Sequence, residues 1–128
     1  MTARSTDAHV QQARSSFNRE AFLARVNNDL DQLLDLVALF LDIYPDSMQR
    51  IEAAVRHQDA ESIRDTAHQF KGSLQFVHAE PAVMAVQKLE RIRGQHQVDE
   101  AAAAFDELVV RIRELEHDLQ DFLSSAIA

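Results

Sequence analysis

Apolar residues recur every three or four positions along three stretches of the chain, which is the spacing of one face of an α-helix. They fall at Leu30, Leu33, Val37, Phe40, Tyr44, Met48, Ile51 and Val55, at Ile63, Ala67, Phe70, Leu74 and Val77, and at Phe105, Leu108, Ile112, Leu115, Leu119, Phe122 and Ala126. Each series is close to a heptad repeat, the pattern of a helix that packs along its length against others. The sequence therefore predicts an all-α protein in which these faces form one core.

Capping residues indicate where the helices begin. Asn18 is a suitable N-cap for a short first helix that ends near residues 27–29. Asn28 or Asp29 then caps the second helix, and Asp59 caps the third. The connections between these helices are therefore expected to be short.

The two prolines and a glycine set the remaining boundaries. Pro45 lies within the second helix, where it removes one backbone hydrogen bond. Because the apolar series continues through it, we expect a bent helix, although two collinear helices that meet at Pro45 also fit. Pro81 suits the first turn of a fourth helix that runs to about Gly94, a typical C-terminal stop, and Asp99 begins a fifth. This order predicts an antiparallel four-helix bundle with a short additional N-terminal helix.

The composition agrees with a single helical domain. The chain has 128 residues, of which 46% are hydrophobic and 27% charged, with only two glycines and two prolines. We expect the bundle to occupy residues 17–128. The polar residues 1–16 are expected to be a mobile N-terminal lead or the remnant of a linker.

Charge and residue usage exclude several classes of function. Cysteine is absent, which excludes disulfides, thiolate catalysis and cysteine-based zinc sites. A net charge of −8 argues against a nucleic-acid-binding surface. No apolar run approaches the roughly 18 residues of a membrane span, and the N-terminus lacks the apolar segment of a signal peptide. We therefore expect a cytoplasmic domain with no direct membrane insertion.

A helical projection places His68 on the solvent side of the third helix. At roughly 100° per residue it lies about 140° from the apolar face, near Arg64, Lys71 and Gln75, while Gly72 lies at about 180°. Most exposed histidines are simply solvated. Gly72 argues for more, because a glycine inside a helix destabilises it by about 1 kcal/mol relative to alanine.

The same glycine clears the approach to the imidazole. With no side chain one turn away from His68, the backbone of another molecule or a bulky anion can come close. Arg64 and Lys71 supply positive charge beside it. An exposed imidazole nucleophile with adjacent cations suits the transfer of a phosphoryl group.

The segment AHQFKGS, residues 67–73, resembles the A-H-x-(apolar)-K-G-(small) signature of histidine-phosphotransfer (HPt) domains, the carriers of multistep phosphorelays. The resemblance extends from Phe17 to about Leu123 and includes the run FNREAFLARVNNDLDQLLDLVALFLDIYPDSMQRIEAAVRHQD. It implies a domain that accepts a phosphoryl group from an aspartate of a receiver domain and passes it to an aspartate of a response regulator. Such a domain is a phosphotransfer intermediate rather than a turnover enzyme.

The resemblance also implies a role for individual residues. His68 matches the phosphoacceptor, and Lys71 matches the lysine that offsets the phosphoryl charge. Gly72 matches the glycine that lets the partner approach, and Ser73 the small residue after it. Glu90 stands twenty-two residues after the histidine, where some members have a Glu or Gln bonded to the imidazole.

A carboxylate at position 90 suits the chemistry of a histidine nucleophile. If Glu90 accepts the Nδ1 proton of His68, it fixes the tautomer and leaves Nε2 free to attack phosphorus. Glu90 flanks the apolar face of its helix, beside Val86 and Leu89, which allows it to turn toward the third helix. The alternative is an ordinary glutamate at a helix edge, paired with a neighbouring arginine.

Two positions depart from the family pattern. Leu74 follows Gly72 and Ser73 where many members have a small residue, but it fits the apolar face. His78 stands where most members have a glycine, ten residues after His68. If that position is left-handed,

Two other functions were weighed. Glu114-x-x-His117 and Asp65-x-x-His68 have the spacing of carboxylate-bridged metal bundles, but both pairs lie off the apolar faces, so we expect no metal site. A helical module that binds a receiver or another partner without phosphotransfer would keep the fold. The presence of both His68 and Lys71 argues against it.

The expected partners are the receiver domains of a hybrid sensor kinase and of a response regulator, with no nucleic acid. We expect a monomer without a cofactor of its own, and Mg²⁺ on the partner receiver domain. The polar lead is compatible with a free-standing protein and with the C-terminal domain of a hybrid kinase. The remaining histidines are expected on the surface or in loops: His9, His57, His96 and His117.

Overall fold

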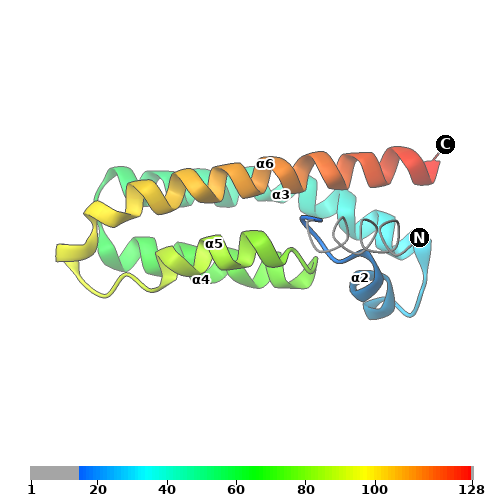
Figure 1. The fold of residues 1–128 in the computed structure, drawn as a ribbon, viewed down its shortest axis with the longest axis horizontal. Coiled ribbons are helices and arrows are strands. Elements are labelled where there is room, and N and C mark those ends of the chain that lie inside the picture. The colour runs from blue at the N-terminus through cyan, green and yellow to red at the C-terminus, as the bar shows by residue number, and fades with distance from the viewer. Residues whose placement is uncertain (1–14, 128) are drawn as a thin grey trace, which may run out of the picture.

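The computed structural model describes residues 15–127. Its elements are α2 (Arg19–Arg25), α3 (Leu30–Arg56), α4 (Ala60–Phe76), α5 (Glu80–Glu90), the 3₁₀-helix η1 (Gln95–Gln97) and α6 (Asp99–Ile127). The four long helices form an antiparallel bundle, and the described residues contain no strand (Figure 1). The predicted fold is therefore confirmed. The proposed lead lies outside the described residues, except for its last two positions.

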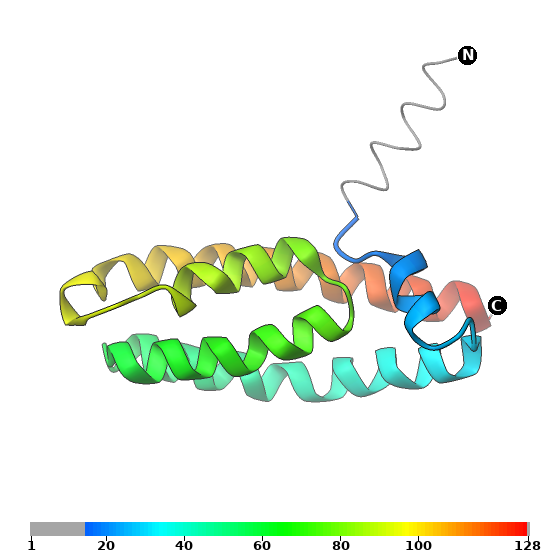
Figure 2. The same cartoon turned by 90° about the horizontal axis from the view of Figure 1, so that it is seen from below.

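Helices α3 and α6 are longer than the hairpin formed by α4 and α5. Each helix of the bundle contacts two others, in the order α3, α4, α5, α6 and back to α3. In Figures 1 and 2, α3 and α6 extend past one end of the α4–α5 hairpin, and α2 lies at that end. The short helix therefore packs where the hairpin leaves the long helices uncovered.

The core is made of the predicted apolar faces, with two exceptions at the ends. Ile63, Leu74 and Leu115 are among the fully buried residues. Leu30 and Ala126 were predicted on the core faces, but both are exposed. Leu30 is the first residue of α3 and Ala126 lies in the last turn of α6. Neither α4 nor α5 covers these ends.

Three side chains cap helices as predicted. Asn18 accepts a hydrogen bond from the amide of Ala21 at 3.0 Å, and Asp29, rather than Asn28, caps α3 by accepting from Gln32. Asp59 caps α4 in the same way. These bonds satisfy backbone amides that have no partner within the helix.

Pro45 lies inside one continuous helix of 27 residues. Of the two interpretations considered for this position, the single helix is correct. Its side chain is exposed, so the ring lies on the outer side of the bundle. The buried residues Phe40 and Ile51 on either side keep both halves of α3 on the core.

The prediction that the fourth helix reaches Gly94 was wrong, because α5 ends at Glu90. The amide of Arg91 still bonds to Gln87, but the amide of Ile92 bonds only three residues back, to Leu89. Ile92 is buried, so the chain turns inward there. Gly94 has a φ of −161°, an extended conformation rather than the left-handed one of a C-terminal glycine.

The packed part of the chain begins before Phe17. Ser16 is buried, and its hydroxyl donates to Oδ2 of Asp118 on α6 at 2.6 Å. The amide of Ser16 bonds to the same oxygen. Ser16 therefore belongs with the bundle rather than with the lead, in which the sequence analysis placed it.

Candidate functional site

His68 projects from α4 into solvent. Its side chain is 72% exposed, whereas Ala67 and Phe70 on the opposite face of α4 are buried in the core. The predicted orientation of the helix is therefore confirmed. The imidazole is open to a partner without any rearrangement of the bundle.

Glu90 joins His68 to Lys71. Its Oε2 is in direct hydrogen-bond contact with Nδ1 of His68, and its Oε1 accepts a hydrogen bond from Nζ of Lys71 at 2.7 Å. Glu90 and Lys71 are 20% and 19% exposed, so this ion pair is partly sheltered from solvent. The alternative in which Glu90 pairs with a neighbouring arginine is not what the structure contains.

The carboxylate of Glu90 is stabilised in its charged form. The hydrogen bond from Lys71, and then that from His68, lower the pKa of Glu90 below its ordinary value. A carboxylate can only accept a hydrogen bond, so the proton in the contact with His68 lies on Nδ1. Nε2 is therefore left with a free lone pair.

Gly72 leaves open space on the same helix. A Cβ added at this position would meet no heavy atom within 4 Å. The predicted clearance is therefore present, one turn from His68.

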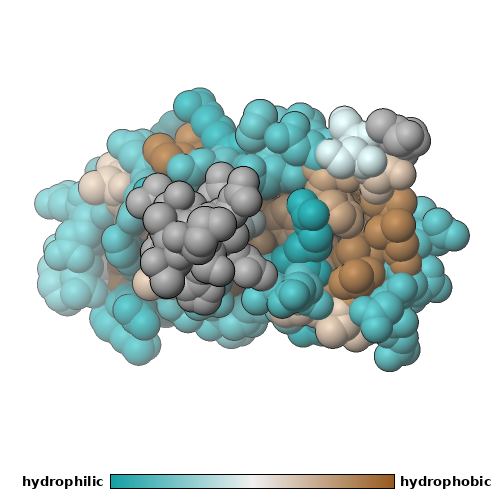
Figure 3. Space-filling model, turned by 45° about the vertical axis from the view of Figure 1, so that its right-hand side comes forward, coloured by the Kyte–Doolittle hydropathy of each residue, from teal (hydrophilic) through white to brown (hydrophobic). Residues whose placement is uncertain are grey.

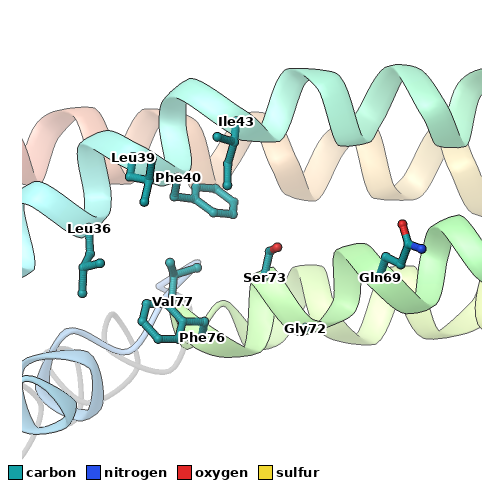
Figure 4. A pocket seen from close by; sticks show the side chains of 9 residues that line it. All are labelled: Leu36, Leu39, Phe40, Ile43, Gln69, Gly72, Ser73, Phe76 and Val77. Carbon is teal, nitrogen blue, oxygen red and sulfur yellow. The ribbon is translucent and has the colours of Figure 1, made fainter.

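An apolar groove runs between α3 and α4 beside Gly72. We define it by the residues that line it: Leu36, Leu39, Phe40, Ile43, Gln69, Gly72, Ser73, Phe76 and Val77. Figure 4 shows side chains of α3 and α4 facing one another across it. Three of its large hydrophobic residues are strongly exposed, Leu39 at 53%, Ile43 at 45% and Phe76 at 40%. The sequence analysis did not identify this groove.

A second depression lies on the other side of His68. Its walls are formed by Arg64, Asp65, His68, Glu90, Arg91 and Arg93, and we call it the His68 hollow. Arg64 is held in place by a hydrogen bond of 3.3 Å from Nη1 to the carbonyl of Ile92. Arg91 and Arg93 were not identified from the sequence, where the only available signal was their position directly after Glu90.

The predicted site residues divide between these places. His68, Glu90 and Arg64 line the His68 hollow, and Lys71 reaches it through its bond to Glu90. Gly72 and Ser73 line the apolar groove instead. Gln75 is exposed on α4 and lines neither depression.

His78 has the left-handed conformation that the family glycine suggested, with a φ of 56°. Its carbonyl accepts from the amide of Asn18 at 2.9 Å, which ties the α4–α5 turn to the start of α2. Its Nε2 accepts from Nε of Arg25 at 3.1 Å, and the ring lies against Phe22. Burial and the charge of Arg25 lower the pKa of His78. Contacts that a glycine lacks therefore offset the backbone strain.

The residues considered for a metal bundle have other partners. Glu114 pairs with Arg111 at 2.7 Å, and His117 lies 3.4 Å from Asp121, both along the surface of α6. Within the described residues, no three His, Asp or Glu side chains gather closely enough to hold a metal ion. In that part of the chain, no helix is long and apolar enough to span a membrane.

Comparison with known proteins agrees with the geometry. The Hpt domain family matches residues 4–125 of the chain. The crystal structure of histidine-containing phosphotransfer protein B (HptB) from Pseudomonas aeruginosa PAO1 is similar in fold, with a TM-score of 0.69 at 15% sequence identity. That similarity covers 88% of this chain and 97% of the other. No curated protein gives a significant match. The chain belongs to the Hpt domain family, the histidine-phosphotransfer carriers of phosphorelays.

Proposed function

We propose that His68 is the residue that carries the phosphoryl group, with Nε2 as the attacking atom. The observation that supports this most strongly is the contact between Nδ1 of His68 and the charged carboxylate of Glu90. It turns the lone pair of Nε2 toward solvent on a side chain that is 72% exposed. Family membership without this geometry would leave the acceptor unassigned among several histidines.

The transfer step balances without a further reactant. The lone pair of Nε2 attacks phosphorus of the donor's aspartyl phosphate, an N–P bond forms, and the P–O bond to the aspartate breaks. The aspartate leaves as a carboxylate, and no proton has to leave Nε2. The imidazole keeps its Nδ1 proton and gains positive charge, which the carboxylate of Glu90 stabilises. Transfer to the next aspartate is the reverse of this step.

Lys71 acts in this scheme as a positioning residue. Its bond to Oε1 directs Oε2 of the same carboxylate toward His68. Glu90 therefore has one lone-pair direction engaged on each side. The lysine fixes the carboxylate, and the carboxylate fixes the imidazole.

The apolar groove is the proposed docking surface for receiver domains. It begins at Gly72, one turn of α4 from His68, and it gathers Leu39, Ile43 and Phe76, three of the most exposed large hydrophobic residues. A partner that reaches Nε2 of His68 must cover this region, and burial of the groove would contribute to its affinity.

The remaining assignments extend this proposal. We propose that the donor is the receiver domain of a hybrid sensor kinase, that the acceptor is a response regulator, and that Mg²⁺ acts on the receiver. The location would be cytoplasmic and the domain a monomer, since one chain supplies every side chain of the proposed site.

A receiver carrying aspartyl phosphate tests the proposal. Incubation with the protein should give phosphate that is labile in acid and stable in alkali, and His68→Gln should abolish it. His117→Gln is the control, because His117 is equally exposed on α6 but far from the groove. Equal labelling of His68→Gln and the wild type would contradict the proposal. Binding of the receiver without any labelling would favour an interaction module instead.

A further inference from the structure

The positive charge of Lys71 is already engaged in the unphosphorylated protein. Its Nζ lies 2.7 Å from Glu90 and its side chain is only 19% exposed. Phosphoryl transfer places negative charge on the equatorial oxygens of phosphorus, and nearby cations must offset it. A lysine held in a partly sheltered ion pair is poorly available for that purpose.

Three other cations stand beside the imidazole. Arg64, Arg91 and Arg93 line the His68 hollow, and none of them forms an ion pair with a carboxylate among residues 15–127. Three such guanidinium groups around one depression are notable in a chain with a net charge of −8.

Two acidic groups also line the hollow, and they do not cancel this charge. Glu90 is bonded to Lys71 and to His68, so its charge is balanced on the side away from the arginines. Asp65 is the remaining acid. Three guanidinium groups against one uncompensated carboxylate leave the hollow net positive.

We propose that Arg64, Arg91 and Arg93 bind the oxygens of the phosphoryl group once it is attached to Nε2 of His68. This inference rests on the proposed function and extends it. The guanidinium group is planar and presents paired N–H donors that match phosphate oxygens. Arg64 is held toward the hollow by the carbonyl of Ile92, and Arg91 and Arg93 follow directly on the last residue of α5. Lys71 orients the nucleophile, and the arginines hold the product.

The phosphoryl group itself reports on its surroundings. Its second ionisation ordinarily has a pKa of about 6, and adjacent cations lower this value because they favour the dianion. The domain can be phosphorylated with phosphoramidate, in which the donor N–P bond breaks, ammonia leaves, and the bond from Nε2 to phosphorus forms. A pH titration followed by ³¹P NMR then measures the pKa without any receiver present.

The variants are Arg64→Gln, Arg91→Gln, Arg93→Gln and the double variant Arg91→Gln/Arg93→Gln. Each should raise the phosphoryl pKa, with about half a unit expected per arginine and more for the double variant. Asp65→Asn should shift it in the opposite direction. Arg113→Gln, on the exposed surface of α6, should leave it unchanged. Arg91 and Arg93 are exposed, so the double variant is expected to fold even if Arg64→Gln destabilises the bundle.

The outcomes separate this inference from the proposed function. Absence of phosphohistidine at His68 in the wild type would contradict both. A wild-type signal whose pKa is the same in the Arg91→Gln/Arg93→Gln variant would overturn the inference alone. The same holds if these variants keep a normal phosphoryl pKa and lose only transfer from a receiver, since the arginines would then recognise acidic groups of the partner.

Discussion

Nδ1 of His68 and Oε2 of Glu90 are in direct hydrogen-bond contact, although 22 residues separate them in the sequence. The α4–α5 hairpin brings them together because the two helices run antiparallel and Glu90 is the last residue of α5. Lys71 holds the other oxygen of the same carboxylate. The nucleophile is therefore oriented by residues of two helices before any partner arrives.

Removal of the Glu90 carboxylate should slow phosphorylation of His68 and change its tautomer. Glu90→Ala should reduce the initial rate of labelling by phosphoramidate by roughly tenfold or more, as is usual for a group that orients a reactive histidine. Long-range ¹H–¹⁵N correlation spectra should show a smaller share of the Nδ1–H form. Glu90→Gln should fall between Glu90→Ala and the wild type.

Glu107→Gln is the matched control for this experiment. Glu107 pairs with Lys88 between α6 and α5, so its loss also breaks an interhelical ion pair, but far from His68. A wild-type tautomer distribution in Glu90→Ala would contradict the orienting role, even if the rate fell.

A methyl group at position 72 should stabilise the domain. Gly72→Ala fills space that contains no other atom within 4 Å, and alanine favours the helix by about 1 kcal/mol over glycine. Urea unfolding should therefore give a higher free energy of unfolding. A decrease would mean that the glycine is needed for the fold itself.

A larger side chain at the same position should block the partner. Gly72→Leu is expected to slow transfer from a phosphorylated receiver by roughly tenfold, about 1.4 kcal/mol, while labelling by phosphoramidate stays normal. Gln75→Leu places the same side chain on α4 outside both the groove and the hollow. Equal transfer by the two variants would show that position 72 is not covered by the partner.

A charge in the apolar groove should also weaken docking. Ile43→Asp introduces a carboxylate at a position that is 45% exposed, so the core is unaffected. Transfer from the receiver should fall by about tenfold or more, with labelling by phosphoramidate unchanged. Val110→Asp, at an equally exposed position on α6, should have no effect. Similar losses for both variants would argue against a specific docking surface.

His78 should make the stability of the domain depend on pH. Its pKa is lowered from 6.5 by burial and by Arg25, so the unfolded chain takes up the proton first as the pH falls. The free energy of unfolding should therefore be highest above about pH 6.5 and decrease below it, until the folded form is also protonated.

His78→Asn provides the comparison, because asparagine tolerates the left-handed conformation and does not titrate. The difference in unfolding free energy between the two proteins should shrink as the pH is lowered from 7.5 to 5. A difference that stays constant over this range would contradict the assignment of this pH dependence to His78.

Most of the fold and half of the site could be predicted from the sequence. The three- and four-residue spacing fixes which face of α4 is buried, and that alone places His68 and Gly72 outside. The ends of the long helices could not be predicted in this way. Leu30 continues the apolar series of α3, but the structure exposes it because the α4–α5 hairpin is shorter than its neighbours.

Features formed by two segments were the ones that the sequence did not reveal. Leu39 and Ile43 lie off the core face of α3 and resemble ordinary exposed hydrophobic residues until α4 places Phe76 across from them. Arg91 and Arg93 were assigned to a continuing helix. Their place beside His68 depends on the end of α5 at Glu90, which follows from the burial of the next apolar residue rather than from a cap.

The central claim is that Nε2 of His68 carries the phosphoryl group. The most direct measurement is a ¹H–¹⁵N–³¹P correlation spectrum of the ¹⁵N-histidine-labelled protein after reaction with phosphoramidate, with His68→Gln as the control. The account predicts a single coupling of phosphorus to Nε2 of one histidine, which disappears in His68→Gln. Coupling to Nδ1, or an unchanged signal in His68→Gln, would contradict it.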